Sequence, residues 1–343
     1  MKGKILVVFA SLLFLAVPVF AEVTVSGDFV FGFNTSDDVY EGVFDTGDLY
    51  FTGSAANGNA AVIFGLDFTN ITNSMSGSPY LDADFISDVY MDLNLTGAMG
   101  LDSPVGVSML FGRSSYGANN YLGDITGYST YDIINAETAT SGYVGLSLNV
   151  LDMVNIVYGL DPNLVDGVQN MYANVNGTFG VVTAEVYGTM VGDKVVNLDD
   201  GIYNAIGADF VAALDTFSFG AGVEYNFDSE GTRYGASART GLIPSTDVGV
   251  AFMGYSDADV NPYGLGFDAN YAVTEDFKVY GALLLKDLEN LDADDMVGFE
   301  ISASYDVASD VTAYAGYVTR GSGFNAVGDV KDDSFFMAVS ASF

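Results

Sequence analysis

Apolar and polar residues alternate with a period of two through most of this chain. The end of the chain shows the pattern clearly, because one set of alternate positions holds Phe335, Met337, Val339, Ala341 and Phe343. Successive side chains of a β-strand point to opposite faces of a sheet, so this segment has one continuously apolar face. A chain built from such segments must cover many apolar strand faces at once, either against a second sheet or against lipid.

The alternation recurs along the whole chain, with no proline-rich or serine-rich linker and no break in composition. Each segment has roughly the 9–11 residues that a tilted strand needs to cross a bilayer. Eighteen segments fit, and sixteen is the alternative if one hairpin is a loop; both numbers are even, as single-chain bacterial membrane barrels require. We therefore predict an all-β, transmembrane, antiparallel up-and-down β-barrel in one domain, 22–343, with strands near 23–33, 47–56, 59–69, 85–97, 104–113, 140–150, 152–160, 168–177, 179–190, 202–213, 216–227, 232–242, 246–256, 263–272, 275–286, 296–306, 310–320 and 333–343.

Short turns alternate with longer polar connections between these segments. The turns include Asn176-Gly177 and Pro244-Ser245, and the longer connections include 34–45 and 70–84. Membrane barrels have tight turns at one end and longer loops at the other. The rhythm therefore favours a barrel over a soluble sandwich. Because an open strand edge is not tolerated in lipid, closure predicts that 23–33 pairs with 334–343.

Tyrosines lie near the ends of many predicted strands. An amphipathic ring suits the boundary between membrane and water, because its hydroxyl group stays hydrated. We therefore predict aromatic girdles at the two interfaces. The tyrosines that would form them are Tyr143, Tyr158, Tyr187, Tyr225, Tyr255, Tyr271, Tyr305 and Tyr317.

Residues 1–21 have the pattern of a cleaved secretory signal. Lys2 and Lys4 precede an apolar run at 5–17, Pro18 ends the run, and a small-residue cleavage site follows at 19–21. The run is shorter than the roughly 20 apolar residues that a membrane helix needs. We predict secretion through the inner membrane and a mature chain that begins at Glu22.

The composition excludes several kinds of chemistry. The chain has no His and no Cys, which removes His-based catalytic triads, cysteine nucleophiles, disulfides and the usual zinc sites. Its 45 Asp and Glu against 10 Lys and Arg give a formal charge of −35, which becomes −37 without Lys2 and Lys4. That charge opposes nucleic-acid binding, which needs basic side chains at the phosphates. We expect no enzymatic activity, no catalytic residue, no cofactor, no metal site and no nucleic-acid partner.

If the apolar strand face meets lipid, the other face lines an aqueous lumen. Strand parity then assigns nine acids and five bases to the inner wall, at positions that we expect to be solvated. The acids are Asp28, Asp67, Asp88, Asp92, Glu185, Asp209, Glu224, Asp268 and Glu300, and the bases are Arg233, Arg239, Lys278, Lys286 and Arg320. A wall rich in carboxylates enriches cations, so we predict a preference for cations. Acidic external loops or a saline habitat would give the same overall charge.

The fifth predicted strand ends in Gly112-Arg113, and the longest gap between predicted strands, 114–139, follows it. With its signal segment, strand rhythm, Gly-Arg pair, long following loop and terminal Phe343, the chain resembles the general porins of bacterial outer membranes. The resemblance implies that this loop folds into the pore, with Arg113 at its root and Asp124, Asp132 and Glu137 near the narrowest section. It also implies a homotrimer, and it makes Phe343 part of the signal for the barrel assembly machinery. The ten bases of this chain are fewer than the family's usual arginine cluster leads one to expect.

These features predict a passive diffusion channel for small hydrophilic solutes and ions, embedded in outer-membrane lipid. Two alternatives stay open. One is a non-conducting structural or surface-antigen barrel. The other is a substrate-specific channel in which loop tyrosines bind a sugar, and these tyrosines are Tyr116, Tyr121, Tyr128 and Tyr131.

Overall fold

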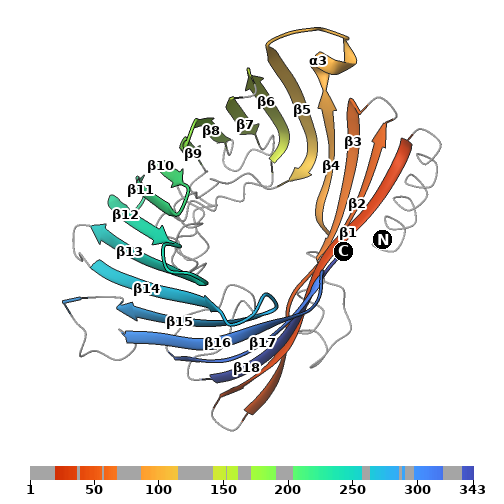
Figure 1. Ribbon diagram of the computed structural model, residues 1–343. Coiled ribbons are helices and arrows are strands. Elements are labelled where there is room, and N and C mark those ends of the chain that lie inside the picture. Colours follow the sequence, from red (N-terminus) through yellow and green to blue (C-terminus); the bar gives the residue numbers. More distant parts are fainter. Residues whose placement is uncertain are drawn as a thin grey trace.

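The computed structural model describes residues 20–36, 39–55, 58–67, 86–114, 142–151, 153–160, 171–190, 204–256, 263–285, 288–289, 297–319 and 334–343. In this part of the chain, strands that follow one another in sequence pair antiparallel, and β1 pairs with β18 to close an 18-stranded barrel (Figure 1). The predicted antiparallel up-and-down barrel of 18 strands is therefore confirmed. The strands are β1 (Phe20–Ser36), β2 (Val39–Ala55), β3 (Ala60–Asp67), β4 (Ile86–Asn94), β5 (Val105–Ser114), β6 (Gly142–Val150), β7 (Val154–Leu160), β8 (Met171–Phe179), β9 (Val182–Met190), β10 (Ala205–Leu214), β11 (Phe217–Asn226), β12 (Gly231–Thr240), β13 (Thr246–Ser256), β14 (Tyr263–Ala272), β15 (Phe277–Leu285), β16 (Val297–Ala308), β17 (Val311–Thr319) and β18 (Ser334–Ser342).

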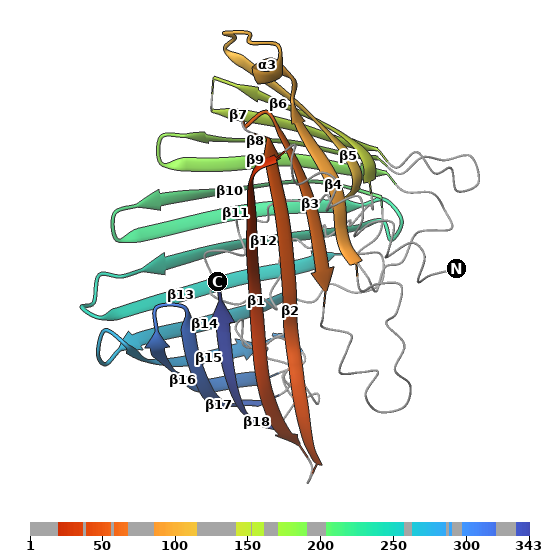
Figure 2. The same cartoon turned by 90° about the vertical axis from the view of Figure 1, so that its right-hand side faces the viewer.

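The first hairpin is longer than the sequence pattern indicates. β1 and β2 have 17 residues each and run along most of the height of Figure 2. The predicted strand 47–56 covers only the second half of β2, because 39–46 pairs with β1 instead of forming a loop. β1 begins at Phe20, just before the predicted mature terminus at Glu22.

Two local predictions are wrong. The predicted turn at Asn176-Gly177 lies inside β8, and the chain turns after Phe179, where Gly180 has a φ of 65°. Glycine adopts this left-handed conformation without steric cost. The end of the predicted strand 85–97 forms a helical turn, α3 (Leu95–Ala98), capped by Asn94. No helix in the described residues is long and apolar enough to cross a membrane.

The ring closes between the first and last strands, as predicted. The register of β1 and β18 runs from Asp28 opposite Ser342 to Thr35 opposite Phe335. Next to the Asp28–Ser342 pair, the backbone N–H groups of Gly27 and Phe343 each donate to the carbonyl oxygen of the other residue at 3.0 Å. The ring of Phe343 stacks on that of Phe29, with centroids 6.0 Å apart and planes 8° apart. The last residue of the chain therefore contributes both backbone and ring contacts to the closure.

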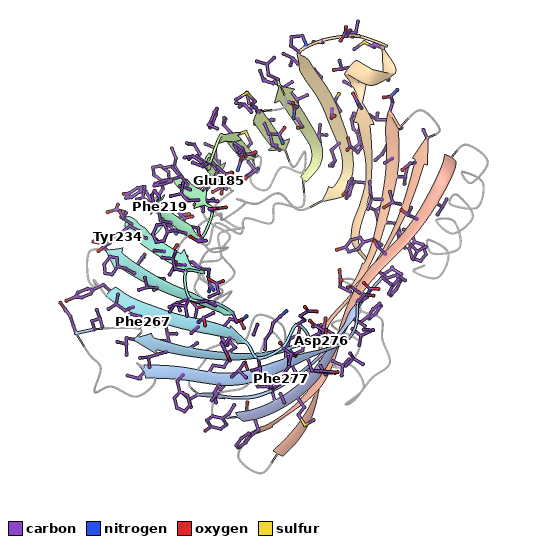
Figure 3. All side chains as sticks on the ribbon, in the orientation of Figure 1. Glu185, Phe219, Tyr234, Phe267, Asp276 and Phe277 are labelled. Carbon is purple, nitrogen blue, oxygen red and sulfur yellow. The ribbon has the colours of Figure 1, made fainter. Side chains whose placement is uncertain are left out.

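Strand alternation separates an outer from an inner face. Figure 3 shows Phe219, Tyr234 and Phe267 pointing away from the ring and Glu185 pointing into it. Outward side chains of the strands are apolar and exposed, as in Ile206 and Ile301, which are 51% and 58% exposed. An apolar outer band of this kind is what a wall in contact with lipid requires.

Rings on the inner face lie across glycines of the neighbouring strand, as at Gly207 and Gly316. The ring of Tyr187 on β9 covers Gly207 on β10. The ring of Phe336 on β18 lies against Gly316 on β17, where an added Cβ would come within 2.6 Å of its Cζ. Glycine within a strand often marks such a close approach. At both positions the absence of a side chain lets a large ring lie flat along the wall.

Candidate functional site

The candidate site is the inner wall of the barrel. Directly opposite residues of an antiparallel pair share a face. Because Glu185 points inward, the residue opposite it on the next strand also points inward, and the same holds from strand to strand around the barrel. Asp209 lies opposite Glu185, and Glu224 lies opposite Arg233. The register places ten of the predicted wall residues on this face: Asp28, Asp92, Glu185, Asp209, Glu224, Arg233, Arg239, Asp268, Lys278 and Glu300.

The remaining predicted residues are less fully placed. Asp67 and Asp88 lie within β3 and β4, but their side chains are outside the described ones. Arg113 pairs with Val89 in the backbone register, next to an irregularity after Phe111, and its side chain is likewise undescribed. The following positions lie outside the described residues altogether: Asp124, Asp132, Glu137, Lys286, Arg320 and the four loop tyrosines. The inward fold of 114–139 therefore stays a prediction.

A hydrogen-bonded network covers the inner face of β8 to β11. The amide nitrogen of Asn174 donates to Oε2 of Glu185 at 2.6 Å and to the hydroxyl of Tyr172 at 2.9 Å. The hydroxyl of Tyr187 crosses β10 and donates to Oε2 of Glu224 at 2.7 Å. Amide and phenol donors thus solvate the two carboxylates in place of water.

Most of the inner acids are buried, which contradicts the expectation that they are solvated. Glu185, Asp209, Glu224, Asp268 and Glu300 are at most 4% exposed, whereas Asp28 and Asp92 are exposed. Parity gives the direction of a side chain, but it does not show what covers that side chain. For Glu224 the covering side chain is Tyr187, for Glu185 it is Asn174 and for Asp268 it is Arg239.

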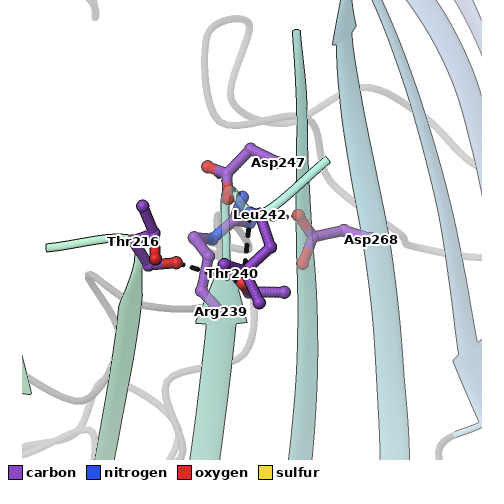
Figure 4. A network of polar contacts seen from close by, with 6 residues as sticks. All are labelled: Thr216, Arg239, Thr240, Leu242, Asp247 and Asp268. Atoms are coloured by element: carbon purple, nitrogen blue, oxygen red, sulfur yellow. Dashed lines mark hydrogen bonds and ion pairs between the residues drawn. The ribbon is translucent and has the colours of Figure 1, made fainter. Parts of the chain in front are cut away.

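Arg239 is held between two carboxylates (Figure 4). Its guanidinium donates to Oδ2 of Asp247 at 2.9 Å and pairs closely with Asp268, whose side chain is 2% exposed. Arg239 reaches Asp268 across β13, above Gly249. A Cβ at Gly249 would fall against the Asp268 carboxylate and 3.1 Å from Nη2 of Arg239. The glycine thus leaves space for a buried ion pair between β12 and β14.

The other described inner bases are also engaged. Lys278 lies 3.6 Å from Oδ2 of Asp306, in a pair that is partly exposed on both sides. The guanidinium of Arg233 lies 5.8 Å from the centre of the Tyr255 ring. Asp247 and Asp306 are inner acids that the predicted set omitted, although their alternate positions in β13 and β16 give the same parity signal.

Two of the predicted girdle tyrosines have a different role. Tyr187 is 2% exposed and Tyr255 lies opposite Arg233, so both belong to the inner face. Tyr225, Tyr271 and Tyr305 are exposed in the way that a girdle needs. Nearness to a strand end does not determine the face on which a tyrosine lies.

The described residues include no group of three or more Asp or Glu that could hold a metal ion. The described inner wall presents carboxylates, guanidinium groups, the ammonium of Lys278, amides and hydroxyls. Such groups can attract, repel or hydrogen-bond ions and polar groups.

No protein-family model matches this chain, and no curated protein sequence matches it either. Several solved structures share its architecture. A triple mutant of Rhodopseudomonas blastica porin is 14% identical, covers 94% of this chain and 100% of its own, and has a TM-score of 0.51. Salmonella typhi OmpF in complex with daunomycin is 10% identical, covers 94% of this chain and 97% of its own, and has a TM-score of 0.56. This chain therefore has the fold of the porins.

Proposed function

We propose that this protein is a passive diffusion channel for small hydrophilic solutes and ions in the outer membrane. The observation that carries the proposal is a closed barrel with an apolar outer face and a polar, carboxylate-rich inner face. Water-filled barrels of outer membranes have this division of faces. Passage would be governed by pore width and wall charge, with no reaction.

We also infer a preference for cations. The described inner wall carries more acids than bases, and Arg239 and Lys278 are paired with acids. The formal charge of the whole chain is −35. A low-dielectric wall focuses such a field and raises the local concentration of the opposite ion.

Reconstitution of 22–343 in a planar bilayer tests the channel function. We expect stepwise increases in current, with a conductance that rises with electrolyte concentration. Liposomes that contain the protein should also swell in small uncharged solutes. A correctly folded barrel that neither conducts nor swells liposomes would instead support the structural or surface-antigen alternative.

We propose that Phe343 helps the barrel assembly machinery to complete the barrel. Its backbone and ring contacts with Gly27 and Phe29 support this role. Phe343→Ala should lower the yield of folded barrel, which keeps its compact migration in unheated gels, because aromatic pairs contribute about 0.5–1.5 kcal/mol. Val339→Ala, an outward position of the same strand, is the matched control. Equal yields of the two variants would rule out the role.

The resemblance further leads us to propose a homotrimer. The mass of the detergent-extracted complex would measure this state directly, and a monomeric mass would exclude it.

A further inference from the structure

The inner wall from β5 to β8 differs chemically from the buried inner wall of β9 to β11. From β5 to β8, the described inner side chains carry no charge, and they include Ser108, Ser147, Asn149, Asn155 and Asn176. These five are half-buried, whereas the charged residues Glu185, Asp209 and Glu224 on the next strands are buried. A solute that touches this side of the lumen therefore meets amides and hydroxyls.

This uncharged wall contains a cavity of about 460 Å³. Its lining residues come from the strand ends next to α3 and from the turn after β6, at the end of the barrel with the tight turns. We call this cavity the β4–β6 pocket. It is lined by Asn94, Ser103, Pro104, Gly106, Ser108, Ser147, Asn149 and Leu151. Its volume falls within the roughly 300–1,000 Å³ of small-molecule sites.

Strand pairing brings the polar groups of the β4–β6 pocket together. Asn94, Ser108 and Ser147 are directly opposite one another on three neighbouring strands, and Asn149 lies two positions along from Ser147. Oδ1 of Asn94 accepts from the backbone N–H of Gly97 at 2.8 Å, which fixes that amide at the rim. Pro104 and Leu151 add exposed apolar surface beside the polar groups.

We propose that the β4–β6 pocket is a binding subsite for neutral polyhydroxylated solutes, such as a mono- or disaccharide. The hydroxyl of Ser147 donates to Oδ1 of Asn155 at 3.4 Å, and the hydroxyl of Ser103 accepts from the backbone N–H of Val105 at 3.1 Å. Each of these hydroxyls keeps a lone pair for a solute, and the amide of Asn94 keeps its two donors. Sugar hydroxyls have the same dual character, and the C–H face of a sugar suits Pro104 and Leu151. A charged solute would find no counter-charge among the lining residues.

Binding in the pocket should be weak. Neutral hydrogen bonds replace equally good bonds to water, so each contributes little net affinity. A dissociation constant on the order of millimolar follows, which lets a solute dwell without blocking the channel permanently. The proposal rests on the diffusion-channel function and adds to it the class of solute retained near the tight-turn mouth.

The test uses the complete mature barrel, with maltose as the neutral probe and lactobionate as a charged probe. Maltose should reduce the single-channel current saturably, and more strongly when it is added on the tight-turn side. Lactobionate should not compete with it. Ser147→Ala combined with Asn149→Ala should weaken maltose binding by about tenfold, because two hydrogen-bonding groups are lost.

Ser304→Ala is the matched control, since Ser304 lies on the inner face of β16, away from the pocket. It should leave the effect of maltose unchanged. Ser108→Ala provides a second pocket variant in case the double variant fails to fold. A maltose effect that does not saturate, or that the pocket variants leave unaltered, would overturn the proposal.

Calorimetric titration of the detergent-solubilised barrel with maltose separates the two proposals. A conducting channel without saturable maltose binding retains the diffusion function and excludes the subsite. A non-conducting barrel that binds maltose through Ser147 and Asn149 would exclude the diffusion function and would support the binding site. The absence of binding heat in a non-conducting barrel would exclude both.

Discussion

Replacement of Arg239 by methionine is expected to destabilise the barrel by about 3–5 kcal/mol, because it leaves a buried carboxylate without its partner. Asp268 has a side chain that is only 2% exposed, and Arg239 reaches it from two strands away. Methionine retains an unbranched apolar stem like that of arginine but removes the charge and all five donors. Urea unfolding of the reconstituted barrel measures the change.

Lys278→Met is the matched control, because the Lys278–Asp306 pair is at least one-third exposed on both sides. Exposed ion pairs contribute roughly 0–1 kcal/mol, so this variant should stay close to the wild type. Addition of Asp268→Asn to Arg239→Met should restore part of the lost stability, since it removes the uncompensated charge. Equal costs for the two single variants would show that the buried ion pair does not stabilise the wall.

Neutralisation of the inner acids is expected to remove most of the proposed cation preference. The variant combines Asp88→Asn, Asp92→Asn, Asp209→Asn, Glu185→Gln, Glu224→Gln and Glu300→Gln. Fields at ordinary salt reach about 8–10 Å, so wall carboxylates act on ions near the wall and lose influence as salt rises. The reversal potential in a KCl gradient should therefore move towards zero, and the wild-type value should itself fall at high salt.

Glutamine keeps a carbonyl acceptor for the hydroxyl of Tyr187 and the amide of Asn174, so the network can persist without charge. A control variant should change acids in the tight turns instead, with Asp215→Asn, Glu275→Gln and Asp310→Asn. If acidity serves only solubility or a saline habitat, neither variant will alter the reversal potential. An anion-selective wild type would refute the cation preference outright.

The sequence predicts the barrel well because side-chain parity is a local property. Alternation along each segment gave a count of 18 strands, with 16 as the alternative, and it identified the closing pair β1–β18. It also assigned Glu185, Asp209 and Asp268 to the inner face. It failed at α3, where the capping of a helical turn by Asn94 interrupts an alternating pattern.

The contacts of the wall were less predictable, because they depend on register across several strands. Arg239 and Asp268 are 29 residues apart and come together only over Gly249. Burial of Glu224 depends in the same way on Tyr187, which lies 37 residues earlier. The β4–β6 pocket was missed for another reason, since its uncharged side chains carry no charge signal for a parity argument.

Among the described residues, inner side chains connect three groups of neighbouring strands. Tyr187 joins β9 to β11 through Glu224, and Arg239 joins β12 to β14 through Asp268. On β18, the ring of Phe336 lies against Gly316 of β17, as does the side chain of Ser302 on β16. A sheet held only by bonds between adjacent strands would unzip one strand at a time under tension. These ties form three mechanical blocks, β9–β11, β12–β14 and β16–β18, so a barrel pulled from one end would give way in fewer and larger force steps.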